Sequence, residues 1–421
     1  MPDRVVVTGL GVCAPNGVGV SAFAKAIQEG TSGITFHQRL ADLQFGCQVA
    51  GTPQVSPELL SLYFTDLELR GLKATGLQYG VIAGMDAWQD AGLQPTLDHP
   101  DYDSGIIFGT GILGVDKFRE AIHLIDAGRT RRLGSTAVLQ TMASGISAYL
   151  SGKLGCGNQV TTNSSACSTG TEAVLMAYDR IRAGKATRML AGSCGDSGPY
   201  IWGGFDAMRI LPSQFNDRPE EASRPMDSQA SGFVPGSGAG ALVLESLASA
   251  QARKATIYAE VLGGAVNSGG QRGGGTLTAA NDEAVQRCIQ EAVQASGVSP
   301  AELDAINGHL TATSKDSTEI KNWCEALNRR GQEFPMINSL KGMTGHCLAA
   351  AGSIECVATV LQIHEQYVFG NVNCDVLHPE IEEWIAKDRV PTQTQTQALN
   401  LVAKASFGFG DVNCCVLFKK F

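Results

Sequence analysis

Residues 159–185 read QVTTNSSACSTGTEAVLMAYDRIRAGK and place Cys167 between a short β-rich run and a helix. Residues 159–162 have strand character, and apolar residues between 174 and 181 recur at helical spacing. Ala183-Gly184 can end the helix. Unpaired N–H groups and the dipole at a helix N-terminus lower the pKa of a nearby thiol. The stretch therefore predicts a strand–turn–helix unit with Cys167 as a nucleophile, although a lone cysteine is more often a small buried apolar residue.

The composition predicts a large, well-packed globular protein. The chain has 421 residues, of which 43% are hydrophobic and 17% charged, and this length favours two domains or two fused similar halves. The net charge of −9 disfavours a nucleic-acid partner. The longest apolar run, 347–363, is interrupted by Ser353 and Glu355, so no membrane span is expected. The twelve cysteines have no CxxC pair or zinc-like spacing, which predicts reduced thiols, no metal site and a cytoplasmic location.

The same order of predicted elements occurs twice along the chain. The first copy runs through strand 5–7, helix 77–91, strand 105–108 and the Cys167 segment, and the second through strand 257–262, helix 281–296, strand 304–307 and the segment 336–363. This duplication predicts an N-terminal half, 1–253, and a C-terminal half, 254–421. Alternating strands and helices predict an α/β fold of stacked sheets with helices on both faces. Residues 200–229, with three prolines, are expected to be irregular.

Two histidines follow strands of the second half. His309 lies in INGHLTATSKDSTE and His346 in SLKGMTGHCLAAAGSIE. Ligands of such sheets bind at the carboxyl ends of strands, so the turns with Cys167, His309 and His346 should converge where the halves meet. Either histidine alone would more often be structural. A thiolate with two imidazoles suits acyl transfer onto sulfur, followed by polarisation of a second thioester, whereas hydrolysis would need only one Cys–His pair.

Lys341 and Glu355 flank His346 in the sequence. Glu355 falls inside an apolar helix, where an unpaired carboxylate would be costly. Lys341 is the natural partner, and the pair is expected to orient His346.

The densest positive cluster of the acidic chain is Arg129, Arg131 and Arg132, in GRTRRLG. Such a cluster could bind an acidic protein or a phosphate. From composition alone, an ordinary solvated surface is at least as good an interpretation.

Taken together, these motifs resemble the β-ketoacyl-(acyl carrier protein) synthases of the elongating I/II type, or ketosynthases, of the thiolase superfamily. The resemblance covers essentially the whole chain, through the motifs RVVVTGLGVCAPNG, SACSTG, ASRPMD, GFVPGSGAGALVLE, NGHLTAT, SLKGMTGHCLAAAGSIE and SFGFGDVN. It implies a five-layered αβαβα fold and a homodimer, or a heterodimer with a ketosynthase-like subunit. It also implies condensation of an acyl thioester with malonyl-acyl carrier protein, without a metal or any cofactor beyond the carrier's phosphopantetheine.

The resemblance also assigns roles to individual residues. It implies a catalytic triad of Cys167, His309 and His346, supported by Lys341 and Glu355. The resemblance further implies phosphopantetheine binding by Thr311 and Thr313, gating of the acyl pocket by Phe409, an oxyanion hole from the N–H groups of Cys167 and Phe409, and substrate contacts from Ile112 and Phe407. Because carrier proteins are acidic, we expect the carrier to dock on the positive cluster of Arg129, Arg131 and Arg132.

Three motifs depart from the family pattern. Residues 309–313 read HLTAT where the family has HGTST, residues 408–411 read GFGD where it has GFGG, and residues 230–240 read ASGFVPGSGAG where it has RDGFVxGEGAG. The loop from the first of these motifs to the following acidic residue is also one residue shorter than in the family. The departures concern the entry loop and the gate, and therefore the acyl chain that is accepted. They leave room for a fatty-acid, polyketide or polyene pathway. A non-enzymatic alternative is a partner subunit like a chain-length factor, but that class lacks the cysteine, so Cys167 favours an enzyme.

Overall fold

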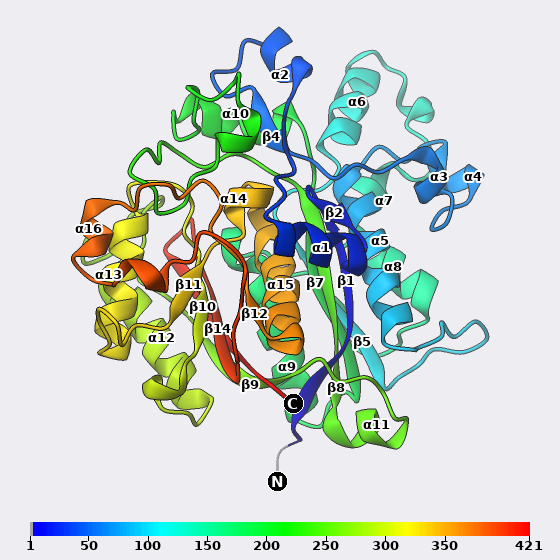
Figure 1. Cartoon of the computed structure of the whole chain (residues 1–421). Coiled ribbons are helices and arrows are strands. Elements are labelled where there is room, and N and C mark those ends of the chain that lie inside the picture. The colour runs from blue at the N-terminus through cyan, green and yellow to red at the C-terminus, as the bar shows by residue number, and fades with distance from the viewer. Residues whose placement is uncertain (1–2) are drawn as a thin grey trace.

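The computed structural model describes residues 3–421 (Figure 1). Within this range, eleven strands pair into one mixed sheet in the order β11-β10-β14-β15-β9-β1-β8-β7-β5-β6, with β2 paired to β1. The first half supplies β1 (Val5–Ala14), β2 (Gly17–Val18), β5 (Ser104–Thr110), β6 (Val160–Thr161), β7 (Arg188–Gly195) and β8 (Gly238–Ser246). The second half supplies β9 (Ala259–Ser268), β10 (Ala305–Asn307), β11 (Met336–Asn338), β14 (Leu401–Gly408) and β15 (Val412–Lys419).

The two halves of the sheet meet along a short edge. Val5–Val7 of β1 pair antiparallel with Ala259–Val261 of β9, whereas β1 pairs with β8 along most of its length. The stacked sheets that the duplication predicts are therefore joined through three residues of each strand. The boundary predicted after residue 253 falls between α11 (Leu247–Ala252) and β9, and the division into domains there stays a prediction.

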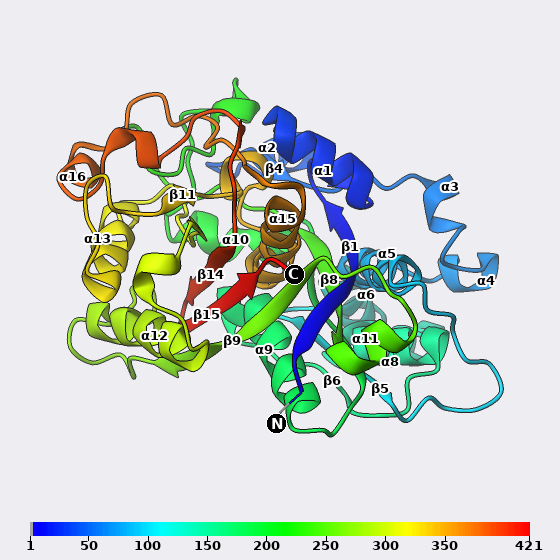
Figure 2. The ribbon, with the colours of Figure 1, turned by 60° about the horizontal axis from the view of Figure 1, so that its bottom comes forward.

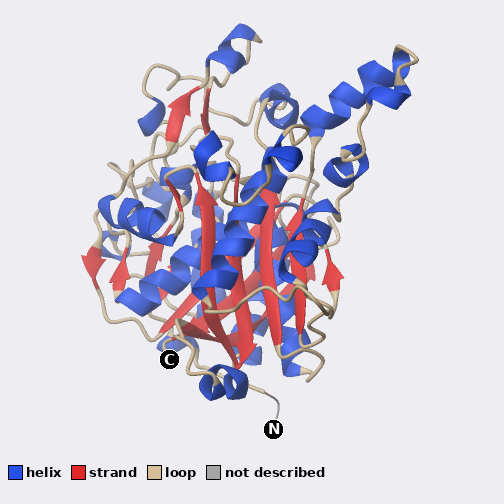
Figure 3. Ribbon diagram, turned by 90° about the vertical axis from the view of Figure 1, so that its right-hand side faces the viewer, coloured by secondary structure: helices blue, strands red, loops and turns tan. Residues whose placement is uncertain are grey.

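Helices form three layers around the two halves of the sheet. The central helices, α9 (Thr169–Arg182) and α15 (Ala351–Glu365), contact each other and strands of both halves. α5 (Thr75–Asp90) and α8 (Gly145–Leu154) pack on the first half, and α12 (Asp282–Ala295) packs on the second beside α13 (Asp316–Leu327). Figure 2 shows these outer helices on opposite sides of α15, and Figure 3 shows the strands running between helices. The predicted five-layered αβαβα fold is confirmed.

Small residues allow the central helices to approach each other closely. A Cβ atom on Gly170 of α9 would lie 2.2 Å from the Ser353 nitrogen of α15, and one on Gly352 would lie 2.6 Å from the Thr171 nitrogen. Because strands cover it on both sides, α15 is buried from Ala351 to Ile363. A helix that is apolar on every face is the sequence pattern of such a position.

Shorter elements complete the described chain. They are α1 (Val20–Glu29), α2 (Gln38–Asp42), α3 (Pro57–Leu60), α4 (Asp66–Leu69), α6 (Val115–Asp126), α7 (Ala137–Thr141), α10 (Pro199–Ala207), α14 (Lys341–Thr344), α16 (Pro379–Glu382), β3 (Ile34–Phe36), β4 (Val49–Gly51), β12 (Tyr367–Val368) and β13 (Gln395–Thr396). The prediction of an irregular segment from residue 200 is wrong at its start, because α10 occupies that position with Pro199 at its first turn, where proline is tolerated. Among residues 3–421, no helix combines the length and the apolar character needed to cross a bilayer.

Candidate active site

A strained turn presents Cys167 to the centre of the molecule. The residue lies in a single 3₁₀ turn, Ala166–Ser168, that leads directly into α9. Ala166 has a φ of 48°, a left-handed conformation that costs free energy for a residue with a Cβ. The Ser168 hydroxyl donates to the carbonyls of Ser406 and Val412, which ties the turn to β14 and β15. The second half of the fold therefore holds the cysteine of the first half in place.

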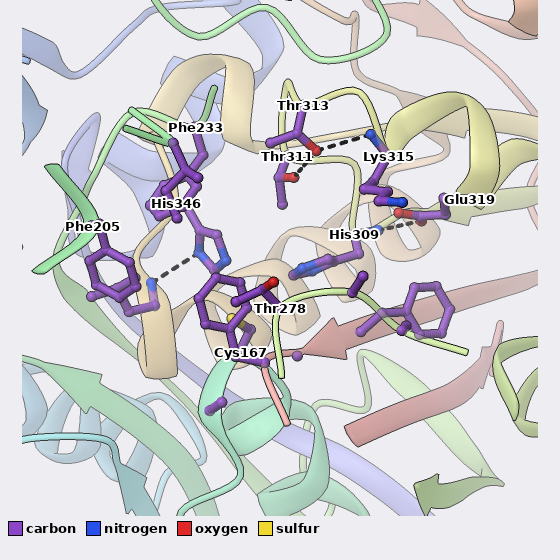
Figure 4. Close-up of a pocket in the computed structure, with 18 of the residues that line it drawn as sticks. Cys167, Phe205, Phe233, Thr278, His309, Thr311, Thr313, Lys315, Glu319 and His346 are labelled. Atoms are coloured by element: carbon purple, nitrogen blue, oxygen red, sulfur yellow. Dashed lines mark hydrogen bonds between the residues drawn. The ribbon is translucent and has the colours of Figure 1, made fainter. Parts of the chain in front are cut away.

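Cys167, His309 and His346 converge as the strand-end rule predicts. One sulfur or nitrogen atom from each side chain lies within 4.8 Å of the other two. The two imidazole rings meet edge to face, with their centroids 5.4 Å apart. Figure 4 shows the three side chains pointing toward one another at the cavity wall. The thiol and both imidazoles can therefore act on one bound group.

The His346 ring has a defined tautomer. The Leu348 N–H donates to His346 Nδ1 at 3.0 Å, so a neutral ring carries its proton on Nε2, the donor left for a ligand. The hydrogen bond on Nδ1 comes from Leu348, and the expectation that Lys341 and Glu355 orient this ring stays a prediction. Burial lowers the pKa of His346 well below its usual value, and the nearby lysines Lys341 and Lys404 lower it further.

The loop after His309 accommodates the departure from the family pattern. Leu310, at the glycine position of that pattern, has a φ of 21°, and Ala312 has a φ of 62°. Both backbones are strained for residues with a Cβ. Glu319 of α13 accepts from the His309 and Leu310 N–H groups, each at 2.7 Å. Burial raises the pKa of Glu319 to about 7, and the Leu310 N–H opposes that rise.

The predicted lowering of the Cys167 pKa is wrong. Burial raises the pKa of this thiol, while the Phe409 N–H and the Lys341 ammonium act in the opposite direction. The free energy needed to remove a thiolate from water is larger than the stabilisation that the N–H groups and the ammonium group give it. Burial also lowers the pKa of His309 well below its usual value. These directions favour a neutral thiol and two neutral imidazoles in the resting site.

The predicted ion pair is present, and it has a third member. Lys341 Nζ lies 2.5 Å from Glu355 Oε1, with both side chains buried. Lys404 Nζ lies 2.9 Å from Glu355 Oε2, as a charge contact without the geometry of a hydrogen bond. The sequence interpretation overlooked Lys404. Its signal is a lysine inside the apolar strand run LVAKASF, since lysine is almost never fully buried without a partner.

Cys167, His309 and His346 all line a cavity of about 710 Å³. Its wall includes the residues predicted to contact the substrate or gate the pocket, namely Ile112, Thr311, Thr313, Phe407 and Phe409. Next to the histidine pair the wall is aromatic, because Phe205 contacts both Phe409 and Phe233 edge to face. Arg129, Arg131 and Arg132 are exposed and lie outside the cavity wall, after α6.

Asp411 anchors the segment that follows Phe409, the residue predicted to gate the cavity. Its side chain is fully buried, and its carboxylate accepts from the Gln271 N–H at 3.0 Å and the Asn281 N–H at 2.8 Å. The loop between these two residues lines the cavity through Gly273, Gly274 and Thr278. The Asp411 carboxylate therefore fastens the segment after Phe409 to a second cavity loop.

Comparisons with known proteins identify the family. Residues 2–250 match the model described as "Beta-ketoacyl synthase, N-terminal domain", and residues 258–375 match the corresponding C-terminal domain. The chain belongs to the β-ketoacyl synthase family. This family member is 35% identical to the chloroplastic 3-oxoacyl-[acyl-carrier-protein] synthase I of Arabidopsis thaliana, an alignment that covers 99% of this chain and 87% of the relative.

Solved structures give the same fold for this β-ketoacyl synthase. One is described as a type II PKS acyl carrier protein in complex with its ketosynthase bound to the hexaketide. It has a TM-score of 0.86 and 29% identity over the full length of both chains. Another is the ishigamide ketosynthase/chain length factor, with a TM-score of 0.89 and 26% identity, again over both full chains.

Proposed function

We propose that this chain catalyses decarboxylative Claisen condensation of an acyl thioester with malonyl-acyl carrier protein, giving 3-oxoacyl-acyl carrier protein. The observation that carries the proposal is the meeting of one thiol and two neutral imidazoles within 4.8 Å at the wall of one cavity. Membership of the β-ketoacyl synthase family and the names of the relatives support the same reaction.

In the first half-reaction, Cys167 takes the acyl group. Its sulfur attacks the thioester carbonyl, and the bond to the phosphopantetheine sulfur breaks as the new thioester forms. The thiol proton passes to the departing phosphopantetheine sulfur. The N–H groups of Cys167 and Phe409 are the proposed oxyanion donors. Because the resting thiol is neutral, a neutral imidazole beside it is the group available to accept its proton during attack.

In the second half-reaction, malonyl-acyl carrier protein binds with Thr311 and Thr313 along its phosphopantetheine arm. The bond between the malonyl methylene and its carboxylate breaks and releases CO2, and the electron pair becomes a thioester enolate. His309 and His346 donate hydrogen bonds to that enolate oxygen. The carbanion then attacks the acyl carbonyl on Cys167. The cysteine sulfur leaves as a thiolate and takes up one proton from solvent, which is the proton that the overall reaction consumes.

Reconstitution tests the proposal. Purified protein, acyl-acyl carrier protein and malonyl-acyl carrier protein should give a 3-oxoacyl carrier protein that is two carbons longer than the acyl substrate, with one CO2 released for each product. Mass spectrometry of the carrier protein measures this directly. Acyl chains of several lengths should be supplied, since failure with every chain would contradict the proposal.

A second candidate function is a largely structural subunit like a chain-length factor. One structural neighbour is described as a ketosynthase/chain length factor, and this description supports the alternative. The presence of Cys167 with both histidines argues for the enzyme.

We propose a homodimer, with a heterodimer as the alternative. Exposed apolar side chains on and near α6 support a partner subunit at that surface, namely Ile112, Phe118, Ile122, Ile125 and Val138.

The proposed carrier-protein surface includes Arg129, Arg131 and Arg132. All three are exposed on a chain of net charge −9, and carrier proteins are acidic. Reversal of Arg131 and Arg132 to Glu should raise the KM for carrier-linked substrate by about tenfold or more, because charge attraction steers encounter. Turnover of a small thioester mimic is the control and should change little. Equal loss on both substrates would contradict docking at this surface. A KM for carrier-linked substrate that does not change with salt concentration would contradict it as well.

The proposed gate is Phe409, and Asp411 restrains it. Phe409→Ala should broaden the range of acyl chains that load onto Cys167, because the ring no longer blocks the cavity. Asp411→Gly should speed loading of chains already accepted, since it removes two hydrogen bonds to the second loop and gives residue 411 a backbone suited to its φ of 63°. Stopped-flow acylation measures both effects. Unchanged chain-length profiles and loading rates in both variants would remove Phe409 from the gate.

The proposed location is the cytoplasm. Thiols stay reduced in that compartment, and the mechanism requires Cys167 as a thiol. The acyl chain that is preferred, and with it a fatty-acid or polyketide pathway, is what the gate variants address.

A further inference from the structure

Lys404 is a fully buried lysine in the middle of β14. Its ammonium donates to the Ala405 carbonyl and, at 3.1 Å, to the Ser406 hydroxyl. It also lies 2.9 Å from Glu355 Oε2, while Lys341 lies 2.5 Å from Oε1 of the same carboxylate. Lys404, Lys341 and Glu355, from β14, α14 and α15, thus form a buried charge cluster of two ammonium groups around one carboxylate.

One carboxylate cannot neutralise two ammonium groups. With both lysines protonated and Glu355 ionised, this charge cluster carries one uncompensated positive charge. Charges removed from water act on their neighbours more strongly and over longer distances than charges at a surface. The neighbours here are His309 and His346. Lys404 pairs across the sheet with Asn307, two residues before His309, and Lys341 begins α14, which ends two residues before His346. Both lysines lower the pKa of both rings. The charge cluster does not line the cavity, so its effect on a ligand passes through the histidines.

We propose that Lys404 is a positioning residue of this site: by sharing Glu355 with Lys341, it leaves one positive charge behind the two imidazoles, which keeps both rings neutral as the pH falls. The inference rests on the proposed function, since neutral rings matter for donation to the enolate. It adds to that function a residue that acts through the histidines without touching the substrate.

The geometry of His346 explains why neutrality matters. Its Nδ1 accepts the Leu348 N–H at 3.0 Å and can do so only while it carries no proton. Protonation would place a proton on Nδ1 against that N–H, so the ring would lose the hydrogen bond that aims Nε2 at the cavity. A positive charge behind the ring opposes this protonation.

Charged and titratable groups face the histidines from several elements. Lys341 and Lys404 come from α14 and β14, and Glu355 comes from α15. Glu319 of α13 accepts from the His309 N–H, and Cys167 faces both rings. Asp316, also on α13, accepts from the backbone of the Thr311–Thr313 loop. Burial is the largest cause of the low pKa of both histidines, and Lys341 and Lys404 each lower the pKa of both rings further.

The test uses the Cys167→Gln background, in which CO2 release from malonyl-acyl carrier protein reports on the histidines alone. Lys404→Met removes the charge and keeps an unbranched side chain. The acid-side midpoint of CO2 release should then rise by roughly half a pH unit or more. Lys404→Gln should shift it in the same direction. Lys153→Met is the matched control, since it removes a partly buried lysine that pairs with Glu68 far from the cavity, and its midpoint should stay unchanged.

A second readout separates this inference from the proposed function. Histidine ring titration by NMR in the same variants should show the His309 and His346 midpoints moving up. If the Cys167→Gln protein released no CO2 at any pH, the proposed function would fail, and the NMR titration would still decide the role of Lys404. A uniform loss of rate with unmoved midpoints in both readouts would show that Lys404 only fills space and would overturn the inference.

Glu355→Gln supplies an arm of opposite sign. Removing the shared carboxylate leaves both positive charges uncompensated, so the histidine midpoints should move down by NMR. This variant answers the question even if neither Lys404 variant folds. A midpoint that stays fixed or moves up in Glu355→Gln would also overturn the inference.

Discussion

Cys167→Ala should reduce condensation by at least about 10³-fold, because no acyl-enzyme can form without the sulfur. The methyl group keeps the strained turn and its contacts to β14 and β15, so the fold and the cavity should persist. Carrier-protein binding should therefore survive, and isothermal titration with acyl-acyl carrier protein measures it. Product formation followed by mass spectrometry measures the loss.

Cys374→Ala is the matched control for this loss. That cysteine is buried, packs in the core of the second half and does not line the cavity. It should retain condensation. An alanine variant at 167 that still elongates acyl chains at a rate close to that of the unmodified enzyme would contradict the covalent mechanism.

Cys167→Gln should release CO2 from malonyl-acyl carrier protein without forming condensed product. The glutamine amide stands in for the carbonyl of an acylated cysteine, and decarboxylation belongs to the histidines. Adding His309→Ala or His346→Ala should lower that release by roughly 10²- to 10³-fold, the usual effect of losing one oxyanion donor. Release of ¹⁴CO2 from labelled malonyl groups measures the rate.

The two histidine rings are held in different ways. His346 is fixed by a hydrogen bond from Leu348, whereas His309 Nδ1 is buried with no protein partner among the described residues. Both rings face the same centre, so both losses should be large. If CO2 release survived either alanine substitution unchanged, that ring would have no part in stabilising the enolate.

Local pattern was enough to predict the parts of the site that neighbouring residues determine. The strand–turn–helix around Cys167 is encoded by residues 159–185, and the placement of His309 and His346 follows from the strand ends that precede them. The Lys341–Glu355 pair could be predicted because an unpaired carboxylate in an apolar helix needs a cation nearby. The layered fold followed from the duplicated order of strands and helices.

The missed features depend on contacts between distant residues. Lys404 meets Glu355 only because β14 packs against α15, 49 residues away in the sequence. The Asp411 contacts to Gln271 and Asn281 span more than 100 residues. The raised pKa of Cys167 follows from desolvation of the sulfur in the folded protein, which the sequence pattern of a helix N-terminus does not show. α10 was missed because the three prolines that predict an irregular segment, Pro212, Pro219 and Pro225, all lie after the helix ends at Ala207.

The central claim, that Cys167 carries the acyl group, is tested most directly by intact-mass measurement after mixing the protein with acyl-acyl carrier protein. The account predicts a mass gain of one acyl group in the unmodified protein and no gain in Cys167→Ala, with the Cys374→Ala control behaving as the unmodified protein. Carrier proteins loaded with different chain lengths should be compared, so that the accepted chain is included. A mass gain that persists in Cys167→Ala, or its absence from the unmodified protein with every chain, would contradict the account.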